Sequence, residues 1–326
     1  MEFFILGGGR WGTALGVHLA RRGHSVLIYD VNEEAVRRIN EGFHPYLRDF
    51  ELPRGISATS ELGEAEAFRE VICALPTQAV REVFSRLKLR GARVISASKG
   101  LEIHTFRRVT EIIRETQEDV EVFALSGPSF AEEVSKGLPT AVVLAYEGSA
   151  DSARELQREL NAENFRIYLN DDIAGVELGG ALKNVIAIAC GISDGLGFGY
   201  NARAALITRG LVEMTRIGVR LGARRETFFG LSGVGDLILT ATSDLSRNRT
   251  FGFLLGQGCS PEEALGKIGQ VVEGAKTVVA LAELTEKMNI YAPITSAVYR
   301  VVVKGEDLKE VLREMLLRSP REEFLL

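Results

Sequence analysis

A glycine-rich loop near the start of the 326-residue chain restricts the fold more than any other sequence feature. The run Gly7-Gly8-Gly9-Arg10-Trp11-Gly12 matches the pattern G-x-G-x-x-G. It follows an apolar run that predicts a strand over 3–6, and it opens a segment of helical periodicity over 12–22. A dinucleotide-binding loop requires this strand–loop–helix context. The sequence therefore predicts a nicotinamide-cofactor site, with a glycine-rich turn that binds nothing as the alternative.

The three glycines of the pattern have separate expected roles. Gly7 permits the tight turn, Gly9 lets the backbone approach the pyrophosphate, and Gly12 lets the helix pack closely on the strand. The pyrophosphate then lies at the helix N-terminus, where unpaired N–H groups attract negative charge. Trp11 is expected either to pack on the cofactor or to fill the seam between domains.

Asp30 ends the next predicted strand, over 25–29, and stands 18 residues after Gly12. A carboxylate there accepts hydrogen bonds from ribose hydroxyls and repels a 2′-phosphate, so the sequence favours NAD over NADP. The alternative for Asp30 is a helix cap before Asn32. Arg37 and Arg38 follow closely, so NADP stays possible.

The pattern of apolar residues divides the chain near residue 171. Before it, strands alternate with helices, which predicts parallel βαβ units with helices on both faces. The predicted strands are 3–6, 25–29, 70–74, 93–97, 122–125, 141–145 and 165–169; the predicted helices are 12–22, 33–41, 78–87, 105–115 and 150–160. After it, only helices are predicted, at 174–192, 202–221, 261–267, 274–288, 294–304 and 308–317. We expect a doubly wound Rossmann-type α/β domain over 1–171, an all-helical substrate domain over 172–326, and chemistry in a cleft between them.

Composition excludes several classes of protein. The net charge of -5 argues against a broad nucleic-acid-binding surface. The N-terminus has neither a basic leader nor a cleavage site. The apolar run 184–192 is shorter than the roughly 20 residues needed to span a bilayer. The three cysteines are widely spaced and form no metal-type pair, so we expect no metal and a reduced, cytoplasmic location.

Lys183 and Asn184 interrupt the most apolar helix of the second half. A buried, unpaired ammonium costs several kcal/mol, so such a lysine usually has a charged partner or a lowered pKa. A lysine of lowered pKa can exchange a proton with a carbonyl/alcohol pair. The alternative is a lysine whose charged end reaches solvent at a domain seam.

Six ordered motifs complete the sequence argument: GGGRWGTAL (7–15), SKGLE (98–102), SGPSFAEE (126–133), GGALKNVIAIACGISDGLGFG (179–199), GLSGVGDLILT (230–240) and SRNR (246–249). With them the chain resembles the bacterial NAD(P)-dependent glycerol-3-phosphate dehydrogenases over essentially its whole length. The resemblance implies a C-terminal domain like that of 6-phosphogluconate dehydrogenase. It also implies hydride transfer between NAD(P)(H) and C2 of sn-glycerol 3-phosphate, giving dihydroxyacetone phosphate and serving phospholipid synthesis.

The resemblance assigns roles to individual residues. The implied catalytic residues, which also contact the substrate, are Lys183, Lys99 and Asp236. Lys183 is the implied general acid/base, Lys99 also a cofactor contact, and Asp236 an acidic residue near the substrate hydroxyls. The implied substrate contacts further include Gly127, Ser129 and a phosphate-binding group of Ser246, Arg247 and Asn248. The implied cofactor contacts are Gly7, Gly9, Arg10, Trp11, Gly12, Asp30, Lys99, Ala131, Arg247, Val271 and Glu273.

Local alternatives exist for several of these residues. Ser129 and Glu132 match a capping box, Asp236 could cap a helix over 237–241, and residues 246–248 alone would be a surface turn. Two other functions fit part of the pattern. A β-hydroxyacid or ketopantoate-type dehydrogenase would not need the phosphate-binding group, and a catalytically silent NAD-sensing protein would not need the two lysines. A homodimer is plausible because the helices are long and apolar.

Overall fold

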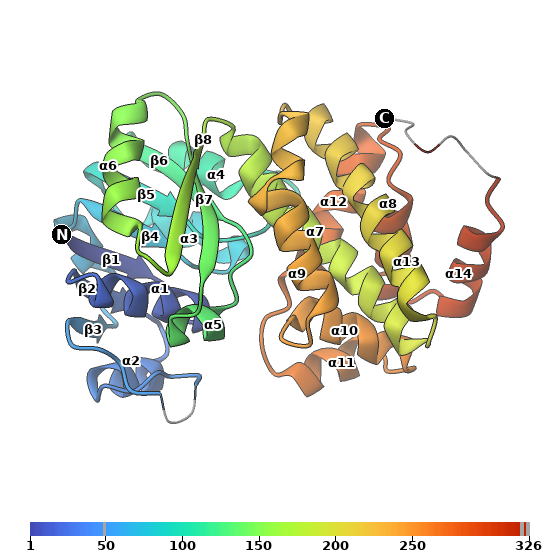
Figure 1. Cartoon of the computed structure of the whole chain (residues 1–326), viewed down its shortest axis with the longest axis horizontal. Helices are drawn as coiled ribbons and strands as arrows, with labels where there is room; N and C mark the ends of the chain where they lie inside the picture. Colours follow the sequence, from blue (N-terminus) through green and yellow to red (C-terminus); the bar gives the residue numbers. More distant parts are fainter. Residues whose placement is uncertain (48–49, 320–322, 324–326) are drawn as a thin grey trace. The chain divides into compact units, whose positions relative to one another are not determined.

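The computed structural model describes residues 1–47, 50–319 and 323. The chain forms two compact units, which we describe separately (Figure 1). Unit 1 comprises Met1–Ser98 and Val109–Ile173; unit 2 comprises Lys99–Arg108 and Ala174–Leu326. This division differs from a single boundary after residue 171, because the segment Lys99–Arg108 belongs to the helical unit. Lys99 is therefore grouped with Lys183 rather than with the sheet.

Unit 1 contains an eight-stranded sheet of order β3-β2-β1-β4-β5-β6-β7-β8. Its strands are β1 (Glu2–Leu6), β2 (Ser25–Tyr29), β3 (Ile56–Thr59), β4 (Glu70–Cys73), β5 (Arg90–Ser96), β6 (Asp119–Ser126), β7 (Thr140–Tyr146) and β8 (Phe165–Asn170). Order reverses on either side of β1 and β4, as in a doubly wound fold. The sequence prediction of this fold is confirmed, with two corrections. The edge strand β3 was missed, and β6 pairs with β7 antiparallel rather than parallel.

Helices cover both faces of this sheet because its strands are apolar on both sides. In β1, Phe3 and Ile5 enter one buried cluster while Phe4 and Leu6 enter another. The helices are α1 (Arg10–Arg21), α2 (Glu33–Asn40), α3 (Val80–Ser85), α4 (Val109–Thr116), α5 (Ala131–Lys136) and α6 (Ala150–Leu160). The loop with the glycine motif follows the end of β1, at the edge of the sheet where β4 also ends.

The helix predicted over 105–115 begins only at Val109. Just before it, His104 and Phe106 have φ angles of 70° and 60°, a conformation that no right-handed helix allows. Leu101 and Arg108 instead form an antiparallel bridge. This compact turn is the part of the first half that packs with unit 2, and it carries Lys99.

Apart from the bridge between Leu101 and Arg108, the regular elements in the described part of unit 2 are helices (Figure 1). Its helices are α7 (Ile173–Gly195), α8 (Gly199–Arg220), α9 (Asp236–Thr242), α10 (Arg247–Gly256), α11 (Pro261–Ile268), α12 (Glu273–Lys287), α13 (Pro293–Val302) and α14 (Leu308–Leu316). Six of these match predicted helices, whereas α10 was missed and α9 was expected only as an alternative. A single buried cluster built around α7 forms the core of the unit.

The central helix α7 is longer than the apolar run 184–192 suggested. Its 23 residues, with a mean hydropathy of 1.5 over the most apolar window, would suffice in length and composition to cross a membrane. However, 89% of that window is buried inside the protein. Core helices of globular proteins meet the same criteria, so α7 is explained by its place in the core.

Candidate functional site

The glycine loop of unit 1 is held against the strand ends by its own backbone. Gly7 has a φ of 108°, and its N–H donates to Tyr29 O over 2.9 Å. A Cβ at Gly12 would lie 1.9 Å from Gly7 O, so only glycine lets α1 begin this close to β1. At Gly9, by contrast, a Cβ would meet no atom within 4 Å. The loop therefore packs tightly against the sheet at Gly12, whereas there is space beside Gly9.

The open side of the loop fits an anionic group. Gly9 is the N-cap residue of α1, and no side chain caps the helix, so its first N–H groups have no side-chain acceptor. Such a helix end attracts phosphate. The buried Arg10 Nε also has no hydrogen-bond partner among the described residues. Both observations fit a bound pyrophosphate, while Trp11 donates to Ala97 O and packs within unit 1.

Asp30 lies directly behind this loop. Its Oδ2 atom is 2.9 Å from where a Cβ on Gly8 would stand, and its Oδ1 accepts from the N–H of Asn32 over 2.8 Å. The residue that caps α2 is Asn32, not Asp30, so the helix-cap alternative for Asp30 is wrong. The carboxylate is half-buried at the end of β2, where a ribose would be bound.

Gly127, Ser129 and Ala131 follow the end of β6 in unit 1. Gly127 has a φ of 143°, and the Ser129 hydroxyl donates to Gly127 O over 3.0 Å. Ala131 is the first residue of α5, whose N-cap is Phe130 without a side-chain hydrogen bond. The predicted capping box is therefore absent here, and Glu132 pairs with Lys136 instead.

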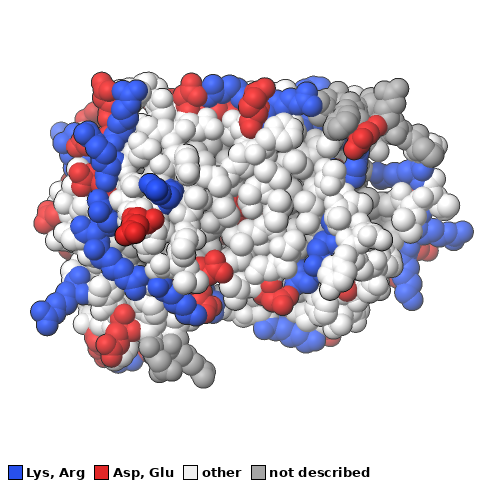
Figure 2. Space-filling model, viewed as in Figure 1, with Lys and Arg blue, Asp and Glu red and all other residues white. Residues whose placement is uncertain are grey.

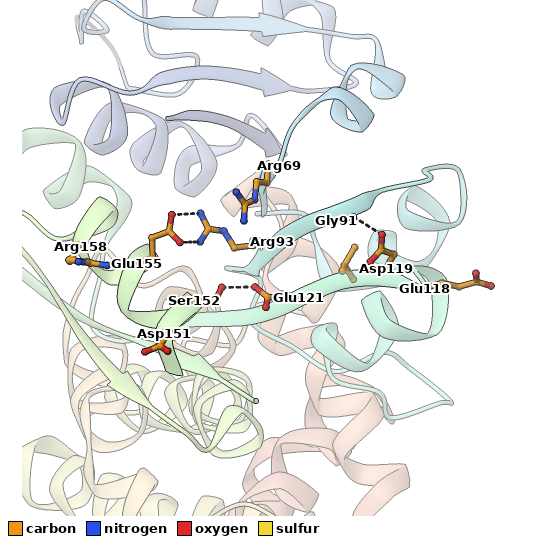
Figure 3. A pocket seen from close by; sticks show the side chains of 11 residues that line it. Arg69, Gly91, Arg93, Glu118, Asp119, Glu121, Asp151, Ser152, Glu155 and Arg158 are labelled. Carbon is orange, nitrogen blue, oxygen red and sulfur yellow. Dashed lines mark hydrogen bonds and ion pairs between the residues drawn. The ribbon is translucent and has the colours of Figure 1, made fainter. Parts of the chain in front are cut away.

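A hollow of about 660 Å³ in the described part of unit 1 lies at the opposite edge of the sheet (Figure 3). Residues at or near the starts of β5, β6 and α6 line it, including Gly91, Asp119 and Ser152. Arg93 extends between Glu70 and Glu155 at 2.6 and 2.9 Å. Because cofactors bind at the carboxyl ends of parallel strands, we interpret this hollow as structural.

Positive charge gathers locally on unit 1. A second hollow of about 600 Å³ is lined by Arg22, Arg158 and Arg166, together with Glu163. Figure 2 shows a band of Lys and Arg side chains on the side of unit 1 where α6 and α1 lie. Acidic side chains accompany the band, so this face is of mixed charge.

Unit 2 brings together three charged side chains that are far apart in the sequence. The Asp236 carboxylate accepts from Lys99 Nζ through Oδ2 and from Lys183 Nζ through Oδ1, each over 2.6 Å. Lys183 also donates to Thr240 Oγ1 over 2.6 Å. We call Lys99, Lys183, Asp236 and Thr240 the lysine–aspartate cluster. Thr240 was not predicted, although it lies one helical turn after Asp236 and therefore shares its face of α9.

Burial determines the electrostatics of this cluster. Lys183 is 6% exposed and Asp236 1%. Burial and, to a lesser extent, the nearby charge of Lys99 lower the pKa of Lys183 to about 8 against the opposing attraction of Asp236. Burial also acts to raise the pKa of the Asp236 carboxyl, but the two lysines outweigh it and hold that pKa below its usual value. The alternative of a solvent-reaching Lys183 is therefore wrong.

The backbone before Asp236 explains how this carboxylate is held inside the unit. Leu231–Gly235 forms a π-helical turn that leads directly into α9, so Asp236 is a helical residue and not an N-cap. A Cβ at Gly179 would lie 2.5 Å from Ser232 O, and one at Gly233 would lie 2.1 Å from Phe228 O. The glycines permit close backbone packing, and π-helical turns are frequent at functional sites.

The residues of the SRNR motif form the first turn of α10 rather than a surface turn. Ser246 is the buried N-cap, and its hydroxyl accepts from the N–H of Arg249 over 3.2 Å. Asn248 donates to Asn184 Oδ1 and accepts from the N–H of Gly274, both over 2.9 Å. Arg247 is exposed. Asn248 thus binds the motif to Asn184, the residue that follows Lys183.

Two further predicted residues lie at the start of α12. Val271 is 49% exposed, and Glu273 is the half-buried first residue of the helix. Gly274, which binds Asn248, comes next. The structure thus places this helix start beside the SRNR motif.

A dinucleotide-type loop on a doubly wound sheet, together with a buried lysine–aspartate cluster in a helical unit, defines an NAD(P)-dependent dehydrogenase. Comparison with known proteins agrees. Residues 2–152 match the family model for the N-terminus of NAD-dependent glycerol-3-phosphate dehydrogenase, and residues 172–313 match the model for its C-terminus. The chain belongs to this family, and it is an oxidoreductase.

Individual relatives cover nearly the whole chain. The chain is 44% identical to glycerol-3-phosphate dehydrogenase [NAD(P)+] of Clostridium tetani, over 98% of this chain and 93% of the relative. It is 45% identical to the protein of the same name from Thermoanaerobacter sp., over 99% of each. A crystal structure of glycerol-3-phosphate dehydrogenase from Coxiella burnetii superimposes with a TM-score of 0.93 at 40% identity, covering 97% of this chain and 99% of that one.

Proposed function

We propose that this protein interconverts sn-glycerol 3-phosphate and dihydroxyacetone phosphate with Lys183 as the general acid/base. The observation that carries this proposal is the single buried carboxylate of Asp236, which holds two lysines at 2.6 Å. A nicotinamide cofactor, when bound, supplies or accepts the hydride at C2 of the substrate. The proton at the C2 oxygen must come from the protein.

Lys183 is suited to move that proton. Its ammonium has three N–H donors, of which Asp236 and Thr240 take two. The third can donate to the C2 oxygen while the alkoxide develops. A lysine with a pKa of about 8 gives up this proton more readily than an ordinary one. In the oxidative direction, neutral Lys183 accepts the hydroxyl proton.

Lys99 and Asp236 provide the other two charges next to Lys183 at the reacting centre. Asp236 offsets the charge of both ammonium groups, so Lys183 stays buried and correctly oriented. Lys99, which is 17% exposed in its side chain, contacts the substrate and the cofactor in this proposal. It belongs to the same compact unit as Lys183 and Asp236.

The substrate phosphate is assigned to the first turn of α10. Arg247 offers a planar guanidinium suited to bidentate binding of a phosphate, and it also serves as a cofactor contact. Asn248 and Ser246 supply further polar groups, and the helix N-terminus adds a favourable dipole. Gly127 and Ser129 of unit 1 are assigned to the substrate as well.

The cofactor is assigned to unit 1 through Gly7, Gly9, Arg10, Trp11 and Gly12. Asp30 makes NAD the preferred cofactor, because its carboxylate repels a 2′-phosphate. Ala131, Val271 and Glu273 are assigned as additional cofactor contacts. Residues 1–171 thus form the dinucleotide-binding domain and 172–326 the substrate domain, with Lys99 added to the latter from the first half.

In its cellular context, the enzyme reduces dihydroxyacetone phosphate in the cytoplasm and supplies glycerol 3-phosphate for phospholipid synthesis. It acts as a homodimer that neither inserts into membranes nor binds nucleic acid. The family membership supports the reaction, and the buried position of α7 supports the absence of membrane insertion.

The experiment that tests the substrate assignment compares Arg247→Gln with the wild type at saturating NADH, using either dihydroxyacetone phosphate or unphosphorylated dihydroxyacetone. We expect the variant to raise KM for the phosphorylated substrate at least tenfold and to change kcat/KM for dihydroxyacetone less than threefold. Equal losses on both substrates would contradict the phosphate site. A wild-type enzyme that does not oxidise NADH with dihydroxyacetone phosphate would overturn the function itself.

A further inference from the structure

Helices α7 and α10 pack side by side in one constant register. Asn248 donates a hydrogen bond to Asn184, which lies 64 positions earlier in the sequence. The same offset recurs one and two turns later, where Gly252 meets Ile188 and Gly256 meets Ile192. The two helices therefore run in the same direction. Lys183 and Arg247 each precede the paired asparagines by one residue, so they occupy equivalent positions in this register.

Four glycines bring the two helix backbones into contact. A Cβ on Gly252 would lie 2.0 Å from Ile188 O, and one on Gly256 would lie 2.4 Å from Ile192 O. Conversely, a Cβ on Gly191 would lie 2.0 Å from Arg249 O, and one on Gly195 would lie 2.3 Å from Phe253 O. Since the atoms met are backbone, they cannot give way as a side chain would. Any larger residue would move α10 away from α7.

A buried ion pair fixes the same two helices near the first turn of α10. Asp194 Oδ2 accepts from Arg249 Nε over 2.9 Å and from Nη2 over 2.8 Å. The side chains are 4% and 11% exposed, so solvent screens this pair far less than a surface pair. Arg203 of α8 binds the other oxygen of Asp194 over 2.8 Å. Asp244, also paired with Arg249, is 95% exposed and contributes little.

From these contacts we propose that Arg249, Asp194 and the four glycines are positioning residues. They fix the spacing between the Lys183 ammonium and the Arg247 guanidinium, and so select substrates with one methylene between the reacting carbon and the phosphate ester. None of them touches the substrate. This inference rests on the proposed function. It adds an explanation of why the enzyme prefers substrates with one methylene between the reacting carbon and the phosphate ester.

The test measures kcat/KM with NADH for dihydroxyacetone phosphate and for its homologue with one more methylene between carbonyl and phosphate ester. For the wild type we expect a ratio of at least 100 in favour of dihydroxyacetone phosphate. Arg249→Gln should reduce this ratio at least tenfold, mostly through a higher KM for dihydroxyacetone phosphate, with kcat lowered less than threefold. Arg249→Lys should restore part of the ratio.

Matched controls are available in the same unit. Arg203→Gln removes a bond to the same carboxylate from a different helix, and should leave the ratio within twofold of wild type. Gly252→Ala, which moves α10, should reduce the ratio as Arg249→Gln does. Gly266→Ala in α11, where a Cβ would meet nothing within 4 Å, should leave it unchanged. Thermal unfolding of each variant identifies any that fails to fold.

The outcomes separate this inference from the function on which it rests. If the wild type fails to reduce dihydroxyacetone phosphate, or Arg247→Gln lacks its selective effect, the proposed function or its phosphate site is wrong. If those two results hold and Arg249→Gln and Gly252→Ala lower kcat/KM equally for both substrates, or leave the ratio unchanged, the positioning role is wrong. A reduced ratio in both, with both controls unaffected, supports it.

Discussion

The glycine loop of unit 1 and the lysine–aspartate cluster of unit 2 are built in different ways. The loop is a contiguous run whose shape depends on missing side chains, since a methyl at Gly12 would lie 1.9 Å from Gly7 O. The cluster joins Lys99, Lys183 and Asp236, which are brought together from separate segments. The first presents backbone N–H groups, and the second presents buried charge.

This difference has a chemical consequence. A backbone-built loop recognises the shape and charge of a phosphate but has no group that titrates near neutral pH. The cluster contains a lysine with a pKa of about 8 and can therefore exchange protons. Binding and proton transfer should be separable by mutation, and the following predictions test that separation.

Asp236→Asn should have the largest effect of these changes. It leaves Lys183 and Lys99 close together in a buried place without a neutralising carboxylate, so the pKa of Lys183 should fall further. We expect kcat to decrease at least 100-fold. NADH affinity, measured by fluorescence titration, should stay within threefold of wild type; a parallel loss of affinity would show that the two regions are not separable.

The pH dependence of the wild type should reveal the titration of Lys183. Reduction needs the protonated amine as the acid, so its kcat/KM should fall about tenfold per pH unit above about pH 8. Oxidation needs the neutral amine, so its kcat/KM should rise up to about the same pH and then level off. Profiles in both directions test this, and a break in the same sense in both would contradict the acid/base role.

Gly9→Ala should weaken cofactor binding without disturbing the fold. A Cβ there meets no protein atom within 4 Å, and the φ of -65° is one that alanine adopts readily. We expect NADH affinity to fall about tenfold, with the unfolding temperature unchanged and kcat at saturating NADH within threefold of wild type. Unaltered affinity would place the pyrophosphate elsewhere.

Asp30→Asn should have the smallest effect. Removing the carboxylate removes its repulsion of a 2′-phosphate, so the ratio of kcat/KM for NADH to that for NADPH should fall several-fold. Parallel assays of wild type and variant with both cofactors measure it. A wild type that prefers NADPH more than tenfold would overturn the role given to Asp30.

The contiguous features were the ones that sequence could predict. The strand–loop–helix context identified the glycine loop, and β2 and α6 were predicted with their observed bounds, 25–29 and 150–160. The edge strand β3 was missed because four residues give too short an alternating pattern. Helix α10 was missed because Gly252 and Gly256 lower its helix propensity, although these glycines allow its contact with α7.

Within the candidate site, sequence identified residue types better than their partners. Lys183 was expected to have a charged partner or a lowered pKa, and Asp236 was expected near the substrate, but their pairing was not predicted. The hydrogen bond to Thr240 and the bonds of Asn248 to Asn184 and Gly274 depend on how helices pack, which no local pattern encodes. The apparent capping box at Ser129 failed because α5 begins at Ala131, so that Phe130 rather than Ser129 is its N-cap.

The division between a cofactor-binding unit and a proton-transferring unit is tested most directly by Lys183→Ala. The measurement is NADH affinity by fluorescence and turnover of dihydroxyacetone phosphate by absorbance, on the same preparation. We predict NADH affinity within twofold of wild type and kcat lowered by roughly 10²–10⁴-fold, the usual contribution of a general acid. A variant that turns over within threefold of the wild type would contradict the assignment of Lys183.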